Sequence, residues 1–136
     1  MTAINDILPY IRGNTRNKIV LCAVPITGLQ YVDVGYELAT LLHKTGGMDN
    51  PDTLCRHVLK PVCKDALIGV YTAIENIGIL FERELHLNIK SLIEQHSNGR
   101  TLIICAEGTV EYGRFLFFEK AAFSVDLEGL SYKSLI

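Results

Sequence analysis

Two acidic residues of the sequence follow apolar runs that have the length of buried strands. Glu75 follows the run Ala66–Ile74, and Glu107 follows the run Thr101–Ala106. The carboxyl ends of parallel strands meet at one edge of a sheet, where α/β proteins bind their ligands. Two carboxylates at that edge could bind Mg²⁺ or orient a water molecule. We interpret them instead as solvated loop acids, because no base or nucleophile stands near either of them in the sequence.

A third apolar run, Lys18–Val24, leads into a loop that contains Thr27 and Gly28. A phosphate-binding loop needs several glycines, followed by a lysine and a serine or threonine that hold the phosphate and its Mg²⁺. Here Tyr31 and Val32 stand where the lysine and the hydroxyl residue are expected. We therefore predict that the chain does not hydrolyse ATP and needs no cofactor. A vestigial nucleotide site would comprise Thr27, Gly28, Tyr31, Glu75 and Glu107.

Basic residues form two clusters along the chain, Arg12, Arg16 and Lys18, and Arg56, Lys60 and Lys64. The second cluster has the spacing of one helical face, provided that the helix continues through Pro61. A solvated helical face is the usual meaning of such spacing. Contact with a phosphate or a nucleic acid is the alternative. Cys55, His57 and Cys63 lie close by, but their spacing matches no zinc motif, so we predict free thiols and no metal site.

The segments between the apolar runs have helical patterns. Helices are predicted for Ala3–Arg12, for Tyr31–Lys44 with Asp33 as its cap, for the segment from Asp52 to Pro61, and for Leu85–His96. Strands that alternate with helices indicate a parallel sheet. We therefore predict one α/β domain over residues 1–136, a three-layer sandwich whose mostly parallel four-stranded sheet has helices on both faces.

The fourth strand of this predicted sheet is Arg114–Glu119, paired antiparallel with Thr101–Ala106 through a turn at Glu107–Gly113. As an edge strand it would offer unpaired backbone groups to a partner. Aromatic side chains also dominate the energetics of protein interfaces. The predicted partner surface therefore comprises Tyr112, Phe115 and Phe117. The alternative for the two phenylalanines is that they fill the core.

Composition limits the possible functions of the chain. Of its 136 residues, 49% are hydrophobic, and 13 basic against 15 acidic side chains give a formal net charge of −2. This balance excludes a highly basic nucleic-acid coat and a disordered chain driven by charge. The longest apolar runs are too short to span a bilayer, and Asp6 interrupts the region where a signal peptide would need apolar residues. We expect a cytoplasmic protein without membrane contact.

Four segments of the second half carry a resemblance to a known family: Glu75–Phe81, Leu87–Ser97, Gly99–Ile104 and Gly108–Gly113. Over Ile74–Ile136 the chain resembles the small P-loop-type protein of BREX phage-defence systems, the short component of the type-3 variety. The resemblance implies an NTPase-like scaffold with a degenerate Walker A loop. In that alignment Gly28 matches a loop glycine, Tyr31 the lysine, and Glu75 the Walker B aspartate.

The resemblance implies a non-catalytic accessory or adaptor subunit of a prokaryotic anti-phage defence system. Such a subunit would act through contacts with other proteins of the same defence complex, and an apolar-rich small domain fits that role. A second hypothesis is a nucleotide- or nucleic-acid-binding module that uses the loop at Gly28 and the basic cluster around Arg16. A third is an inhibitor of the immunity or antitoxin type, which the length and the mild acidity fit.

Overall fold

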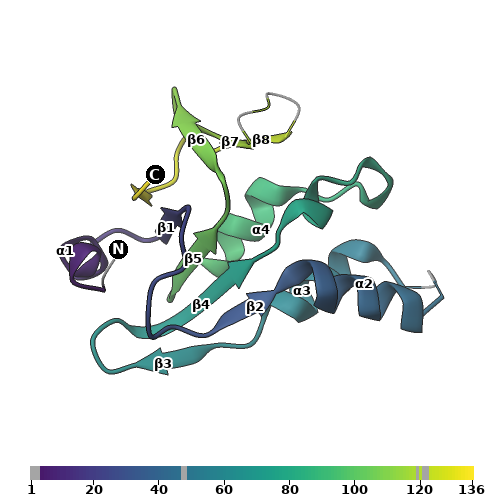
Figure 1. Cartoon of the computed structure of the whole chain (residues 1–136), viewed down its shortest axis with the longest axis horizontal. Coiled ribbons are helices and arrows are strands. Elements are labelled where there is room, and N and C mark those ends of the chain that lie inside the picture. Colours follow the sequence, from purple (N-terminus) through teal and green to yellow (C-terminus); the bar gives the residue numbers. More distant parts are fainter. Residues whose placement is uncertain (1–3, 47–48, 119, 121–122) are drawn as a thin grey trace.

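The computed structural model describes residues 4–46, 49–118, 120 and 123–136 (Figure 1). Its helices are α1 (Leu8–Ile11), α2 (Val34–Lys44), α3 (Pro51–Leu59) and α4 (Ile89–His96), with short 3₁₀ helices η1 (Ile4–Asp6), η2 (Gly78–Phe81) and η3 (Arg83–Leu85). Its strands are β1 (Lys18–Cys22), β2 (Tyr31–Asp33), β3 (Cys63–Asp65), β4 (Gly69–Glu75), β5 (Thr101–Cys105), β6 (Gly108–Glu111), β7 (Arg114–Phe117), β8 (Ser124–Asp126) and β9 (Lys133–Ser134). None of the described helices is long and apolar enough to cross a membrane.

Six strands of the described chain form the main sheet, in the order β2-β4-β5-β1-β9, with β3 beside the first half of β4. Neighbours along this path are parallel, and β3 is antiparallel to β4. All residues of β5 are buried, because this strand lies in the middle of the sheet and is covered on both faces. The prediction of a mostly parallel sheet that contains the three apolar runs is confirmed, although residues 66–68 of the second run form the turn before β4.

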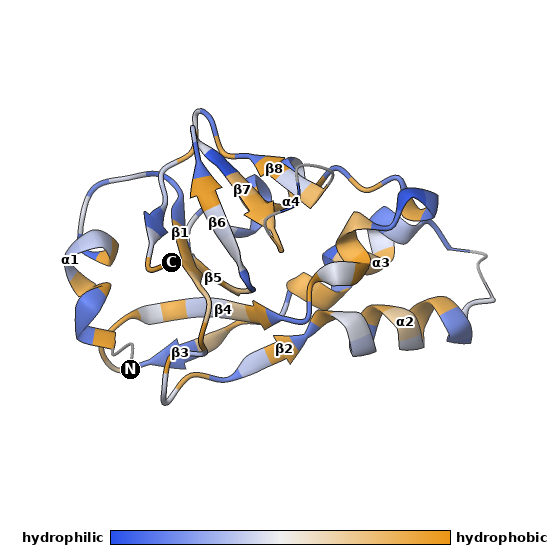
Figure 2. Ribbon diagram, turned by 45° about the horizontal axis from the view of Figure 1, so that its top comes forward, coloured by the Kyte–Doolittle hydropathy of each residue, from blue (hydrophilic) through white to orange (hydrophobic). Residues whose placement is uncertain are grey.

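Helices pack on both faces of the main sheet, but to unequal extents. Helices α2, α3 and α4 lie together on one side (Figure 1), and their core includes Ile19, Leu38, Leu59, Leu92 and Ile104. The opposite face is covered by α1 and by the connection from β1 to β2, and its core includes Ile7, Val20, Ile26, Ile103 and Cys105. Successive strand residues alternate between the two cores. Figure 2 shows hydrophobic stretches on both the strands and the helices that enclose them.

Strand β7 is not part of the main sheet. It lies between β6 and β8 in a separate three-stranded antiparallel sheet. The predictions of a four-stranded sheet and of pairing between Arg114–Glu119 and Thr101–Ala106 are therefore wrong. Both sides of β5 are already occupied by β1 and β4, and Tyr112 and Gly113, with φ of 51° and 76°, form a tight turn that pairs β7 with β6 instead. Glu119 lies outside the described residues.

The helix predicted from Tyr31 begins at Val34, because the residues before it form β2. Asp33 caps this helix as predicted, since its carboxylate accepts a hydrogen bond from the backbone N–H of Tyr36 at 2.9 Å. The loop after β1 therefore leads into an edge strand and not directly into a helix. A phosphate-binding loop depends on the N–H groups at a helix N-terminus, and this loop does not have one beside it.

Candidate functional site

The loop between β1 and β2 runs across the thinly covered face of the main sheet. Ile26 is buried in the core of that face, and its backbone N–H donates to the Tyr31 hydroxyl at 2.8 Å. Thr27 and Gly28 are exposed at the outer side of the loop. Tyr31 lies at the start of β2, and its hydroxyl holds the backbone of Ile26 in the loop. Its pKa is raised by burial.

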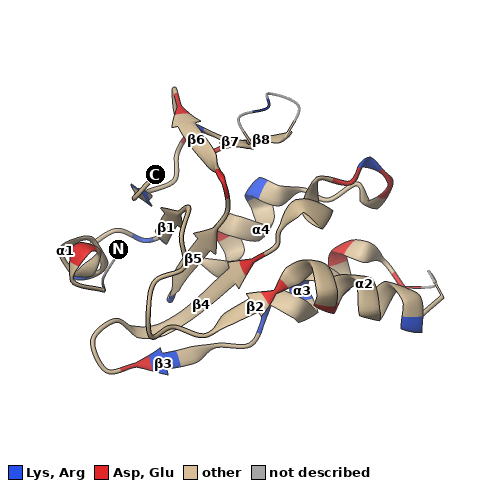
Figure 3. Cartoon of the chain, in the orientation of Figure 1, with Lys and Arg blue, Asp and Glu red and all other residues tan. Residues whose placement is uncertain are grey.

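Glu75 and Glu107 line one pocket at the carboxyl ends of β1, β4 and β5, with a volume of about 540 Å³. We call it the carboxyl-end pocket. Cys105, Phe117 and Phe118 also line it, and none of its lining residues is a lysine or arginine. Figure 3 shows the acidic segments in red at the tip of β4 and between β5 and β6. The residues of the predicted vestigial site are thus divided, since the pocket contains the two glutamates but not Thr27, Gly28 or Tyr31.

The turn after β4 is held against the start of α2. Asn76 has a left-handed backbone with φ of 53°, its side-chain amide donates to Asp33 at 2.8 Å, and its carbonyl accepts from the N–H of Gly35 at 2.9 Å. A Cβ at Gly35 would lie 2.5 Å from the Asn76 amide nitrogen, so a larger residue there would displace the Asn76 side chain. The Tyr36 N–H and the Asn76 amide lower the pKa of Asp33.

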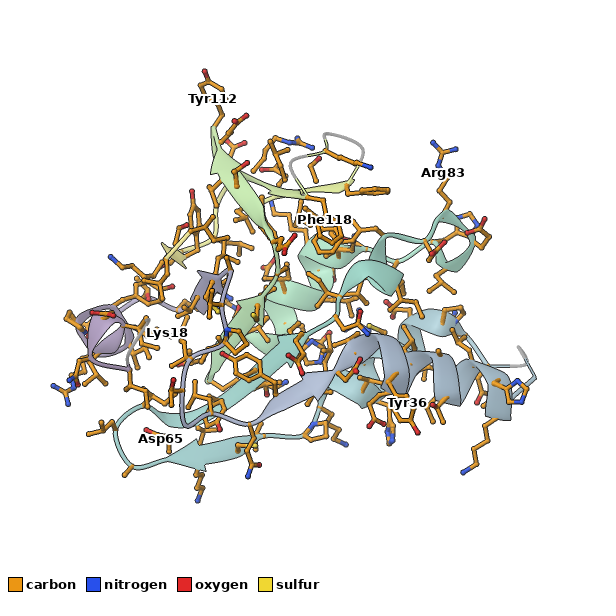
Figure 4. The ribbon with its side chains drawn as sticks, viewed as in Figure 1. Lys18, Tyr36, Asp65, Arg83, Tyr112 and Phe118 are labelled. Atoms are coloured by element: carbon orange, nitrogen blue, oxygen red, sulfur yellow. The ribbon has the colours of Figure 1, made fainter. Side chains whose placement is uncertain are left out.

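Aromatic rings form the wall of the pocket on the side of the small sheet. Phe117 stacks on Phe81 at 5.0 Å between ring centroids and contacts Phe118 at 4.2 Å. Phe115 and Phe117 are only 2% and 7% exposed, so both fill the core and do not form the predicted exposed partner surface. Tyr112 is fully exposed at the tip of the hairpin (Figure 4), which leaves it as the accessible residue of the predicted partner surface.

Phe118 was not predicted as a site residue, although it is 51% exposed at the rim of the pocket. Its backbone has φ of 53°, a conformation that bulky residues rarely adopt and that costs about 1–2 kcal/mol. The sequence around it reads as a continuous strand. The change of backbone direction that brings the ring to the surface therefore has no signal in the residue pattern.

Two thiols stand side by side behind the pocket, since Cys22 and Cys105 are register partners on β1 and β5. Burial, and then the neighbouring Cys105, raise the pKa of Cys22 to about 12. Burial likewise raises the pKa of Cys105. Neutral buried thiols are poor nucleophiles. The described residues also contain no group of three or more His, Cys, Asp or Glu side chains that could hold a metal ion.

Part of the second basic cluster lines another pocket, of about 460 Å³, between the C-terminal ends of α3 and α4. We call it the cationic pocket. Arg56 and Lys60 line it together with Arg100, which sequence analysis missed. Lys64 does not, because α3 ends at Leu59 and Lys64 belongs to β3. Arg100 comes directly before β5, so its place at the amino end of a predicted strand was the available signal.

The first basic cluster is not concentrated in one site. Arg12 and Arg16 are exposed, and the Lys18 ammonium donates to the Gly13 carbonyl and lies 5.8 Å from the centroid of the Tyr10 ring. Lys18 thus has contacts within its own chain that explain its position. None of the three lines the carboxyl-end pocket or the cationic pocket.

Comparisons of this chain with protein-family models, with curated proteins and with solved structures found no match. The candidate sites are therefore defined by their geometry and charge.

Proposed function

We propose that the chain is a non-catalytic adaptor that binds a partner protein at the carboxyl-end pocket. The partner would place a lysine or arginine side chain beside Glu75 and Glu107, with the aliphatic stem of that side chain against Phe118. The setting that the sequence resemblance implies, an anti-phage defence complex, is part of this proposal.

The observation that carries the proposal is the half-exposed ring of Phe118 on a left-handed backbone, at the rim of an acidic pocket. Strained backbone persists where the surrounding structure holds it, and it is concentrated at binding sites. Exposed aromatic side chains act as anchors in protein interfaces. A ring of this kind beside two carboxylates suits a cation with an apolar stem.

The charge of the pocket favours a basic partner over a nucleotide. The two glutamates have no cationic residue beside them in the lining, so a phosphate at this place would be repelled. A basic side chain would instead be attracted and oriented. The buried thiols lack the low pKa that a covalent mechanism requires, which supports binding and not catalysis as the role of the pocket.

Co-purification of the tagged protein with the products of its neighbouring genes tests the proposal. The pocket variants are Phe118→Asn and the double variant Glu75→Gln with Glu107→Gln. Asparagine tolerates a left-handed backbone, so Phe118→Asn removes the ring without adding strain. We expect each variant to lower partner recovery by roughly tenfold, as loss of an interface anchor does. Recovery with the wild-type protein should also fall as the salt concentration rises.

Matched control variants are Glu84→Gln and Tyr36→Gln. Glu84 is an exposed acid in η3, and Tyr36 is an exposed aromatic residue on α2, on the opposite side of the molecule from Tyr112 (Figure 4). Neither lines the carboxyl-end pocket. The controls should recover the partner like the wild type. The proposal fails if folded pocket variants recover the partner fully, or if the controls lose it to the same degree.

A further inference from the structure

The cationic pocket lies away from the carboxyl-end pocket and is not explained by the proposed adaptor role. Every residue that lines it is polar or charged, and none is acidic. Three of them, Arg56, Lys60 and Arg100, carry a positive charge. A volume of about 460 Å³ lies within the range of small-ligand sites, which is about 300–1,000 Å³.

Arg100 is fixed in place by three hydrogen bonds to neutral acceptors. Its Nε donates to the His96 carbonyl at 2.9 Å, and its Nη1 donates to the Lys60 carbonyl at 3.0 Å and to the Thr72 hydroxyl at 3.1 Å. No carboxylate in the described part of the chain pairs with it. The guanidinium keeps a full charge and the donors of Nη2, while burial lowers its pKa. A half-buried cation of this kind is stabilised by an anion.

Capping of helix ends is the simpler explanation for these cations, and it accounts for part of the arrangement. The carbonyls of Lys60 and His96 belong to the C-terminal ends of α3 and α4, where positive charge is favourable. Arg100 alone places a positive charge at the C-terminal ends of both helices. Helix capping therefore does not explain the ammonium of Lys60. Arg56 is paired with Asp52 at 2.7 Å through Nε, and both of its terminal nitrogens keep their donors.

His96 gives the pocket a further polar group at its inner side. The side chain is 4% exposed, and its Nδ1 lies 2.8 Å from the Leu92 carbonyl, so Nδ1 carries the proton and Nε2 is the nitrogen left for a ligand. Burial lowers the pKa of His96, and the hydrogen bond to the Leu92 carbonyl opposes this effect. Arg100 and Arg56 lower the pKa further, against a smaller opposite effect of Asp52. An anion among these cations would offset their influence on the imidazole.

We propose that the cationic pocket binds a phosphate group, with Arg56, Lys60 and Arg100 as its positively charged ligands. Two guanidinium groups can each donate paired hydrogen bonds to phosphate oxygens, and the ammonium adds a compact positive charge. Every side chain of the lining ends in a polar or charged group and none is acidic, which suits a hydrated anion. Either a nucleotide or the backbone of a nucleic acid could supply this phosphate.

Calorimetric titrations at low salt, in a chloride buffer without phosphate or sulfate, test the site. The probes are inorganic phosphate, adenosine monophosphate and an eight-nucleotide single-stranded DNA. We expect binding of at least one probe, with an affinity that falls by roughly tenfold in Lys60→Gln and in Arg56→Gln, as for loss of one charge-assisted hydrogen bond. Both side chains are accessible at the surface, and denaturation midpoints will verify folding.

Lys64→Gln is the matched control, since it removes the same charge from a residue outside the lining. It should leave the affinity unchanged. Similar affinities for the monophosphate and the DNA identify a small phosphorylated ligand, whereas a much tighter, steeply salt-dependent affinity for the DNA identifies a nucleic acid. The proposal is overturned if no probe binds at millimolar concentration, or if Lys64→Gln weakens binding as much as Lys60→Gln.

Discussion

The two ends of the described fold contrast in both charge and construction. At the carboxyl ends of β4 and β5, acids and an exposed aromatic ring surround a pocket, and its shape depends on close backbone contacts at glycines. At the C-terminal ends of α3 and α4, cations surround a pocket whose shape depends on the hydrogen bonds of one arginine. The formal net charge of −2 therefore describes neither pocket.

Because of this contrast, the net charge of the chain does not indicate the charge of its binding partners. A mildly acidic total argues against binding to nucleic acid only if the charges are mixed evenly over the surface. Here the linings of the two pockets each carry charge of one sign, and this depends on which strand or helix end each lining residue follows. Opposite partners can therefore be proposed for the two pockets of one small chain.

The largest effect is expected from Gly108→Ala, beside the carboxyl-end pocket. A Cβ at this position would lie 2.4 Å from the Leu116 carbonyl oxygen and 2.7 Å from the Phe115 ring. Either β6 separates from β7 or the buried ring moves, and overpacking of this kind destabilises by about 3 kcal/mol. Urea denaturation followed by circular dichroism measures the change in the free energy of unfolding.

Gly78→Ala is the control for that substitution, because it adds the same methyl group in the lining of the same pocket. Its Cβ would lie 3.8 Å from the Phe117 ring, an ordinary contact distance. We expect a change of less than about 1 kcal/mol. Equal effects of the two substitutions would contradict the view that close backbone approach at Gly108 shapes this end.

The next largest effect is expected from loss of the Arg100 hydrogen bonds that hold the cationic pocket together. Arg100→Met keeps an unbranched side chain, shortened by the guanidinium end, but removes the donors to the carbonyls of Lys60 and His96. The His96 carbonyl is partly buried and would lose its donor, whereas the Lys60 carbonyl is exposed and can bind water. We therefore expect a destabilisation of about 1–2 kcal/mol. The same denaturation experiment with Arg16→Met, at an exposed residue, should show almost no change. If both variants lose only a little unfolding free energy, water replaces the guanidinium of Arg100 as the donor to the two carbonyls, and the prediction is contradicted.

The long elements of the fold could be predicted from the sequence because their patterns are strong. The apolar runs of β1 and β5 and the second half of β4 are buried on both faces, and Asp33 has the residue type and position of a helix cap. The short strands could not be predicted in this way, since β2, β3 and β9 have two or three residues each. Such segments are strands only because a longer neighbour offers them hydrogen bonds.

The sites were predictable only in part, for a related reason. Residues that follow a strong strand, such as Glu75 and Glu107, are brought together by parallel topology alone. Arg100 and Phe118 depend on tertiary structure: one reaches two helix ends, and the other is turned outward by its own backbone. The predicted face with Lys64 failed because Pro61 lies just beyond the end of α3, so the last lysine of the series belongs to a strand.

A smaller effect is expected in the pH dependence of stability, through His96. Because its pKa is lowered in the folded protein, the unfolded chain binds the proton more readily below the ordinary value of about 6.5. Stability from this residue is complete above that pH and falls as the pH decreases, with a slope of at most about 1.4 kcal/mol per unit. His96→Asn keeps a donor for the Leu92 carbonyl and lacks this dependence.

Denaturation of both proteins from pH 7.5 to pH 5.5 isolates the contribution of the histidine from other titrating groups. The difference in unfolding free energy between wild type and variant should shift against the wild type as the pH falls. Phosphate bound in the cationic pocket should reduce that shift, because an anion near Arg56 and Arg100 favours the protonated imidazole. A constant difference across this range would show that His96 keeps its ordinary pKa.

The smallest effect, and one of opposite sign, is expected at the tip of the hairpin with Tyr112→Asn. Tyr112 and Gly113 both have positive φ, as in the type I′ turn, which favours asparagine at the first position. The tyrosine ring is fully exposed, so the substitution removes little packing, and we expect stabilisation by about 0.5–1 kcal/mol. Thermal and urea denaturation measure the gain.

The same variant tests whether Tyr112 contacts a partner. A contact with a partner would explain why this position has a tyrosine that lowers the stability of its own chain. Recovery of the partner should then fall in Tyr112→Asn, although this variant is more stable. If stability rises and recovery is unchanged, the partner surface is limited to the carboxyl-end pocket.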